Sequence, residues 1–90
     1  MRLAALAALL LTLSVLVSGS ALAGGRAAFR AERDRRLAET DWTAVRAYER
    51  GEPVPEAWVA YRQALRDLPE QLTDEQVLAG NIPWPEPPKL

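Results

Sequence analysis

The sequence contains no cysteine and no histidine. Without cysteine the chain cannot form a disulfide, carry a lipoprotein acyl anchor or offer a thiol nucleophile. Without histidine it lacks the commonest metal ligand and the usual general base at neutral pH. The two absences together exclude nearly every zinc, haem or iron–sulfur site. We therefore predict a protein that is not an enzyme, with no catalytic residue, no metal and no cofactor.

An excess of charge of one sign is also missing. The 90 residues include 11 basic and 12 acidic side chains, which gives a formal net charge of −1. A near-neutral chain has no electrostatic reason to bind nucleic acid, and we expect no nucleic-acid partner. The length allows one small domain. A domain of this size buries only a modest core and is marginally stable alone.

The first part of the chain is a long uncharged segment. No residue between Arg2 and Arg26 is charged, and residues 3–17 are almost entirely Leu, Ala and Val. Residues 21–23 read Ala-Leu-Ala, the small-x-small spacing that signal peptidase recognises. One interpretation is a secretory signal cleaved after Ala23, which would leave a periplasmic or secreted protein.

The charges around this segment favour another interpretation. Residues 3–23 would form a helix of about 31 Å at about 1.5 Å per residue, enough to cross a bilayer. Arg2 is the only charged side chain before the segment, whereas five arginines follow closely, at positions 26, 30, 33, 35 and 36. Positive charge beside a membrane segment tends to stay cytoplasmic. We therefore predict a helix that is retained, either as a membrane anchor or packed on protein.

The remaining chain predicts an all-α fold of short helices. Residues 26–39 contain good helix formers and no Gly or Pro, so they predict a solvated helix that can continue the hydrophobic segment. The Gly24-Gly25 pair before it indicates flexibility between the two segments. Residues 42–50 predict a second helix, which Thr40 or Asp41 caps and Gly51 ends.

Two further helices are predicted after a rigid Glu-Pro-Val-Pro turn. Residues 55–68 form the clearer one, with a proline at the first helical position and Pro69 as its stop. Thr73 and Gln76 have the spacing of a capping box, which begins a two-turn helix that Gly80 ends.

These elements divide the chain into three parts. Residues 1–25 form a hydrophobic segment that resembles a signal or an anchor, residues 26–81 a helical interaction domain, and residues 82–90 a proline-rich tail. The predicted fold is a small helical hairpin with short extra helices, preceded by a hydrophobic helix and followed by an extended tail.

One apolar stripe organises the predicted hairpin. Its residues are spaced three, four and three apart, which places them on one helix face. They are Trp58, Tyr61, Leu65 and Leu68. We predict that the stripe packs on the preceding helices. The predicted core residues are Leu37, Trp42, Val45, Leu65 and Leu68. The alternative is that the stripe binds a partner, with Trp58 and Tyr61 as the candidate residues.

Residues 82–88 form a stiff segment. Four of these seven residues are proline, which favours an extended, polyproline-like backbone that loses little entropy on binding. Trp84 lies between Pro83 and Pro85, and it either folds back on the helices or is offered to a partner. We predict that these three residues dock into a groove on another protein.

Three pieces of the sequence carry a family resemblance. They are residues 33–43 (RDRRLAETDWT), residues 57–69 (AWVAYRQALRDLP) and the closing Pro-Trp-Pro of residues 83–85. These pieces resemble the small phage tail assembly chaperone proteins. In that family an arginine-rich helix runs into a Ser/Thr-Asp-Trp-Thr turn, followed by a Tyr-Arg-x-x-Leu-Arg-Asp-Leu/Ile-Pro helix and a terminal Trp-Pro. The resemblance covers residues 30–88. It leaves out the hydrophobic segment, and residues 71–81 look inserted.

The resemblance implies a function in phage tail assembly. It implies help in assembling a tail or tail fibre by binding a tail or tail-fibre protein, in the host cytoplasm or in the virion. We therefore predict a non-enzymatic interaction module, either a tail assembly chaperone or a minor tail component. The alternative is a secreted or membrane-anchored helical adaptor of a membrane complex, with residues 3–23 contacting the membrane.

Overall fold

The computed structural model describes the backbone of residues 2–89 and the side chains of residues 20–89. Four helices follow one another along the chain, and the described residues contain no strand, which confirms the all-α prediction. They are α1 (Arg2–Glu39), α2 (Trp42–Arg50), α3 (Glu56–Gln71) and α4 (Asp74–Ala79).

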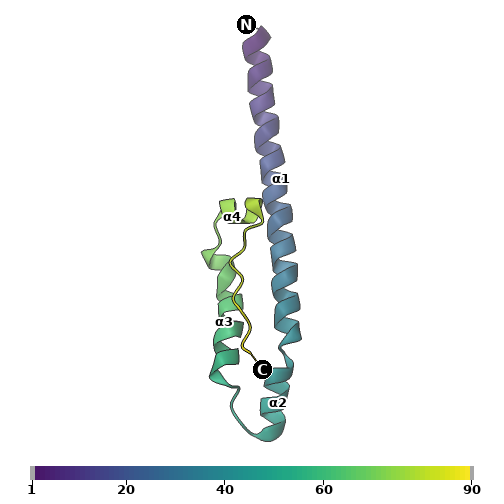
Figure 1. Cartoon of the computed structure of the whole chain (residues 1–90). Helices are drawn as coiled ribbons and strands as arrows, with labels where there is room; N and C mark the ends of the chain where they lie inside the picture. Colours follow the sequence, from purple (N-terminus) through teal and green to yellow (C-terminus); the bar gives the residue numbers. More distant parts are fainter. Residues whose placement is uncertain (1, 90) are drawn as a thin grey trace.

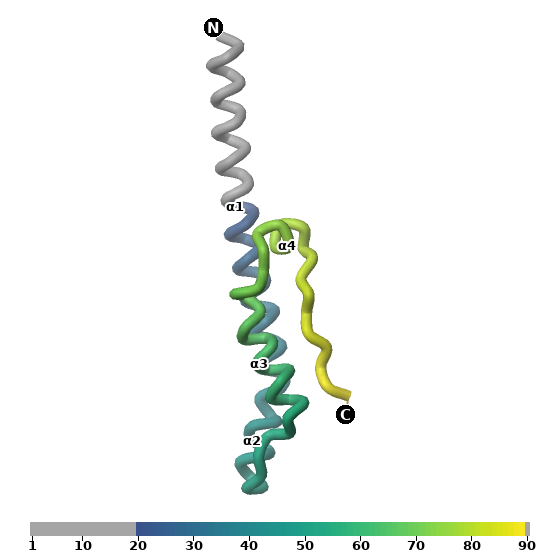
Figure 2. The backbone as a smooth tube through the Cα atoms, turned by 90° about the vertical axis from the view of Figure 1, so that its left-hand side faces the viewer, coloured from purple at the N-terminus to yellow at the C-terminus, as the bar shows by residue number. Residues whose placement is uncertain are grey.

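The helices form a hairpin whose two long arms run in opposite directions (Figure 1). Helix α1 runs down to the turn and α2 lies beyond its end, after which α3 returns alongside α1. Helices α3 and α4 both pack on α1. The tail then runs back along the α1–α3 pair towards α2, as the two views show together (Figures 1 and 2).

The two predicted glycine stops and the predicted capping box are confirmed. Gly51 and Gly80 have φ angles of 65° and 69°, the left-handed conformation that glycine adopts without a steric penalty. At the start of α4 the Thr73 hydroxyl accepts a hydrogen bond from the Gln76 amide, and the Gln76 side chain accepts one from the Thr73 amide. Both signals depend on a few neighbouring residues, so the sequence alone specifies them.

One predicted stop and one predicted cap are wrong. Pro69 does not stop α3, which runs on to Gln71 with the proline inside it. The ring removes one amide donor, but the Leu72 amide still donates to the Leu68 carbonyl at 3.2 Å, and both leucines are buried. At the start of α2 the Asp41 side chain makes no capping hydrogen bond, because its carboxylate pairs with α3 instead.

The core lies where α1, α3, α4 and the tail meet. Its buried residues come from three segments of the chain, and they are Phe29, Leu68, Leu72 and Val77. Leu22, Ile82 and Trp84 pack against them from the edges. Helix α4 can approach α1 closely because position 25 is glycine, where a Cβ would lie 2.8 Å from Cγ1 of Val77. Gly25 therefore permits the close packing of α4 on α1, and the flexibility predicted for the Gly24-Gly25 pair stays a prediction.

The predicted hairpin core is correct on α3 and wrong on α2. Leu65 is fully buried and Leu68 is buried, whereas Leu37 is half-buried. Trp42 and Val45 remain 41% and 55% exposed, so they are not core residues. Helix α2 lies beyond the end of α1 and buries its opposite side, where the small side chains are. The buried residues of α2 are Thr43 and Ala47.

Within the part of the chain that the structure describes, no helix is long and apolar enough to cross a membrane. The side chains of residues 3–19 lie outside the described residues. The predictions of a retained membrane segment and of a cleaved signal fall mainly on these residues, and both stay predictions. Helix α1 runs unbroken across residues 25 and 26, and the division into three parts also stays a prediction.

Candidate functional site

A largely buried arginine, Arg62, links α3 to the turn between α1 and α2. The guanidinium of Arg62 donates to the Leu37 carbonyl at 2.8 Å, to the Thr40 hydroxyl at 2.7 Å and to the Asp41 carboxylate at 2.9 Å. Its side chain is 14% exposed. One planar group with several donors thus fixes the end of α1 and the start of α2 against α3.

Aromatic side chains add contacts between α2 and α3 next to these Arg62 hydrogen bonds. The rings of Trp42 and Trp58 meet edge to face at 5.5 Å, and Trp58 meets Tyr61 in the same manner at 6.2 Å. Tyr61 is buried, so in this structure it contributes to the hairpin rather than to an open surface. Trp58 is half-buried and retains a free side.

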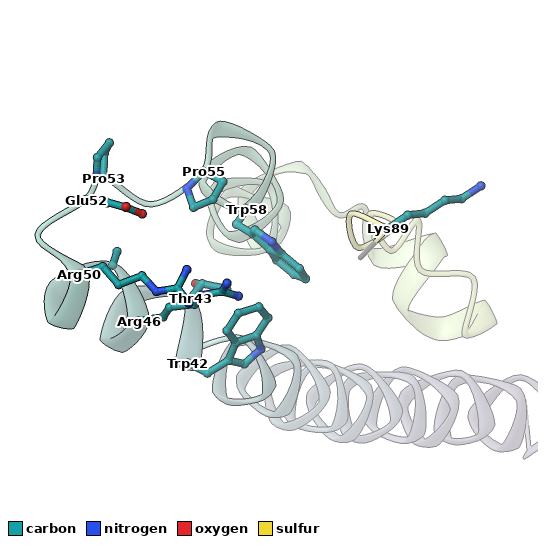
Figure 3. A pocket seen from close by; sticks show the side chains of 10 residues that line it. Trp42, Thr43, Arg46, Arg50, Glu52, Pro53, Pro55, Trp58 and Lys89 are labelled. Carbon is teal, nitrogen blue, oxygen red and sulfur yellow. The ribbon is translucent and has the colours of Figure 1, made fainter.

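A pocket of about 230 Å³ opens beside the two tryptophans, between α2 and α3 (Figure 3). Its apolar side is formed by Trp42, Trp58 and the two prolines of the turn, Pro53 and Pro55. Its polar residues come from α2, the turn and the tail. They are Thr43, Arg46, Arg50, Glu52 and Lys89.

The same end of the hairpin also exposes apolar side chains that do not line the pocket. Val45 and Tyr48 of α2 are 55% and 89% exposed, and Val59 of α3 is also exposed. We call residues 42–59 the hairpin tip. Large apolar side chains that gather on one end of a small protein are typical of a protein-binding surface.

The first residues of the proline-rich tail pack on the opposite end of the hairpin. The Trp84 ring stacks on Phe29 of α1 with centroids 5.3 Å apart, and the Arg36 guanidinium lies 4.2 Å from the Trp84 ring centre. Of the two alternatives given for Trp84, folding back on the helices or contact with a partner, the structure has the first. Pro83 is exposed and Pro85 is half-buried, and their proposed contact with a partner stays a prediction.

The arginines of α1 are largely neutralised by neighbouring carboxylates. Arg35 and Arg36 both donate to Glu32, which lowers the pKa of that carboxyl to about 2. The same contacts, with a further ion pair to Glu39, raise the pKa of Arg35. Arg26 pairs with Asp74 of α4 at 2.6 Å. This side of α1 is therefore a network of ion pairs rather than a surface that attracts anions.

The family described as phage tail assembly chaperone protein matches residues 26–89. The chain belongs to the phage tail assembly chaperone family. No curated protein and no solved structure matches it. The matched range includes all three motifs of the resemblance. In the structure Arg62 binds the turn at Thr40 and Asp41, and Arg36 lies over the Trp84 ring, so the three motifs contact one another.

The sequence analysis assigns no role to Arg62, Arg46 or Arg50. The apolar stripe of α3 pointed to the correct helix face, but nothing in it showed which side chains of α2 would remain uncovered. The pocket depends on how α2 lies relative to α3, a relation between residues far apart in sequence. One pattern in the sequence does point to the pocket: Arg46 and Arg50 are four residues apart, which places both on one side of α2.

Proposed function

We propose that this protein is a tail assembly chaperone that acts without catalysis, by holding a tail or tail-fibre protein against the hairpin tip. The observation that carries the proposal is the exposed apolar surface of α2, in a chain of this family. A chaperone must cover apolar surface on another protein before that protein assembles. An uncovered apolar surface of its own supplies the complementary contact.

The two ends of the hairpin support this choice of surface. At the end near α4 the large side chains are covered by α4 and by the tail, including Phe29 and Val77. At the tip, Tyr48 and Val45 have no such cover. Trp58 lines the pocket at the same end of the hairpin and remains in the proposed contact, whereas the docked ring of Trp84 stabilises the fold.

Co-expression with tail and tail-fibre proteins tests the proposal. We expect the full chain to co-purify with one of them, and Val45→Asp to reduce that capture by about tenfold, since central interface residues carry most of the binding energy. Leu78→Asp is the matched control, because Leu78 is 50% exposed and belongs to α4, which lies at the other end of the hairpin from α2 (Figure 1).

Both variants replace an exposed side chain, so melting temperatures close to that of the unchanged protein are expected for both. Equal capture by the two variants would place the contact elsewhere. A chain that captures none of the tail or tail-fibre proteins would contradict the proposed function itself.

A further inference from the structure

We propose that the pocket between α2 and α3 binds an acidic peptide segment with one large apolar side chain. This inference rests on the proposed function, because the segment belongs to the tail or tail-fibre protein that the tip holds. The pocket, its cations and its aromatic wall together specify this ligand chemistry.

The apolar half of the pocket suits a single side chain. Its wall consists of the edge-to-face pair Trp42 and Trp58, with Pro55 beside them at the start of α3 (Figure 3). The volume of about 230 Å³ is smaller than the range of about 300–1,000 Å³ typical of sites for drug-sized ligands and cofactors. One leucine-like or aromatic side chain, with its backbone at the rim, is the ligand of matching size.

The charged half of the pocket is basic. Arg46 and Arg50 of α2 and Lys89 of the tail line it, against one lining carboxylate, that of Glu52. Within residues 20–89 none of these three cations takes part in an ion pair. They differ in this from Arg26, Arg33, Arg35 and Arg36 of α1, each of which has a carboxylate partner. An arginine fork binds a carboxylate with two parallel hydrogen bonds, so acidic side chains are the complementary groups.

The distribution of charge favours a peptide over a nucleic acid or a lipid surface. The chain as a whole carries a net charge of −1, and the unpaired cations of the pocket form one cluster beside an aromatic wall. Nucleic-acid binding needs several cations that follow successive phosphates. A short acidic segment with an apolar anchor needs only the cluster and the wall.

The tail contributes a weaker, peripheral charge. Lys89 borders the pocket on the side away from Arg50, and its ammonium group points outward in Figure 3. The docking of Trp84 on Phe29 holds the tail along the hairpin and so keeps Lys89 near the tip. Since rim charges contribute little, Lys89→Gln is expected to weaken peptide binding by only about twofold.

Three short peptides test the ligand chemistry on the full-length, ¹⁵N-labelled protein. The probes are the blocked peptides Glu-Asp-Leu-Glu-Asp, Gln-Asn-Leu-Gln-Asn and Glu-Asp-Ala-Glu-Asp. The first should shift the indole N–H signals of Trp42 and Trp58 and leave that of Trp84 unchanged. The second, which lacks charge, and the third, which lacks the anchor, should each bind about five- to tenfold more weakly.

A paired substitution tests the residues. Arg46→Gln with Arg50→Gln should remove the preference for the acidic peptide, whereas Arg30→Gln with Arg66→Gln should preserve it. The control arginines are also exposed and lie outside the pocket. Circular dichroism is expected to show the same helical signal for both double variants, because neither removes an ion pair or a buried group seen among the described residues.

Several results would overturn the inference. They are equal binding of the acidic and neutral peptides, a response confined to Trp84, no effect of the Arg46 and Arg50 pair, or tighter binding of a DNA oligonucleotide or phosphatidylserine vesicles. Each is distinct from failure of the proposed function, in which the unchanged protein captures no tail protein. If the Arg46 and Arg50 variant still captured that protein fully, this inference alone would fail.

Discussion

The two ends of the hairpin use similar side chains in opposite ways. At the end near α4, aromatic and aliphatic groups are closed over by the tail, and Arg36 covers the Trp84 ring. At the tip, Trp42 and Tyr48 lie on the surface and Arg46 and Arg50 have no carboxylate partner within residues 20–89. The comparison teaches that the α4 end stabilises the hairpin and leaves the tip free to make contacts.

The division has an energetic reason. A domain of this size has a stability of only a few kcal/mol, so it must concentrate its buried apolar area in one place. Helix α4 and the tail provide that area by covering Phe29 and Leu68 from two directions. The tip is then held by Arg62 and by aromatic edges, which orient α2 without burying its apolar side chains.

The largest expected effect comes from disrupting the core at the α4 end of the hairpin, where α4 and the tail cover Phe29, Leu68, Leu72 and Val77. We call this the closed end. Phe29→Ala removes a buried ring that contacts both the core cluster and Trp84. Deleting such a ring costs about 3–5 kcal/mol, comparable to the whole stability of a small domain. We expect loss of the cooperative urea transition measured by circular dichroism. Val59→Ala, at an exposed site, is the control, and an unchanged transition for Phe29→Ala would mean that the core lies elsewhere.

A smaller effect is expected from breaking the joint between the two ends. Arg62→Gln removes hydrogen bonds to the Leu37 carbonyl and the Asp41 carboxylate from a nearly buried position. Hydrogen bonds to a charged group contribute about 1.5–3 kcal/mol, and we expect a loss of unfolding free energy in this range.

The matched control for this joint is Arg66→Gln, one helical turn further along α3 on its exposed side. Surface substitutions of this kind change stability by about 0.5 kcal/mol or less. Urea midpoints of the two variants provide the comparison. If both lost the same stability, Arg62 would not be the residue that joins α3 to the turn.

The outcome for each residue shows what a sequence can specify. Thr73, Gly51 and Gly80 were predicted correctly because a cap or a stop depends on residues within one helical turn. The stacking of Trp84 on Phe29 joins positions far apart, and it depends on how α4 redirects the chain. Similarly, the position of Val45 depends on where α1 ends relative to α3, and the apolar spacing of α2 contains no such information.

A modest effect is expected at the cap of α4, which holds Val77 in the closed end. Thr73→Ala removes the hydroxyl that accepts from the Gln76 amide, a change that costs about 1 kcal/mol at helix starts. Thr73→Ser keeps the acceptor and should retain most of the stability. Thermal melting of the two variants tests the difference, and equal losses would show that the methyl group rather than the cap matters.

The smallest expected effect concerns the acid dependence of the closed end. The hydrogen bonds from Arg35 and Arg36 lower the pKa of Glu32 from 4.5 to about 2. A carboxyl whose pKa is lower in the folded state stabilises the fold above its unfolded pKa, and this contribution is lost as the pH falls through the folded pKa. Stability from Glu32 should therefore be complete above about pH 4.5 and should disappear towards pH 2.

Protonation of Glu32 also reaches the tail, because the carboxylate positions Arg36, whose guanidinium covers Trp84. Urea midpoints measured between pH 5 and pH 2 should fall more steeply for the unchanged protein than for Glu32→Gln, which has no proton to gain. High salt should narrow the difference, since the pair is partly exposed and salt screens it. If the urea midpoints of the two proteins changed with pH in the same way, Glu32 would not be one of the residues that hold the tail. The closed end would then depend on apolar packing alone.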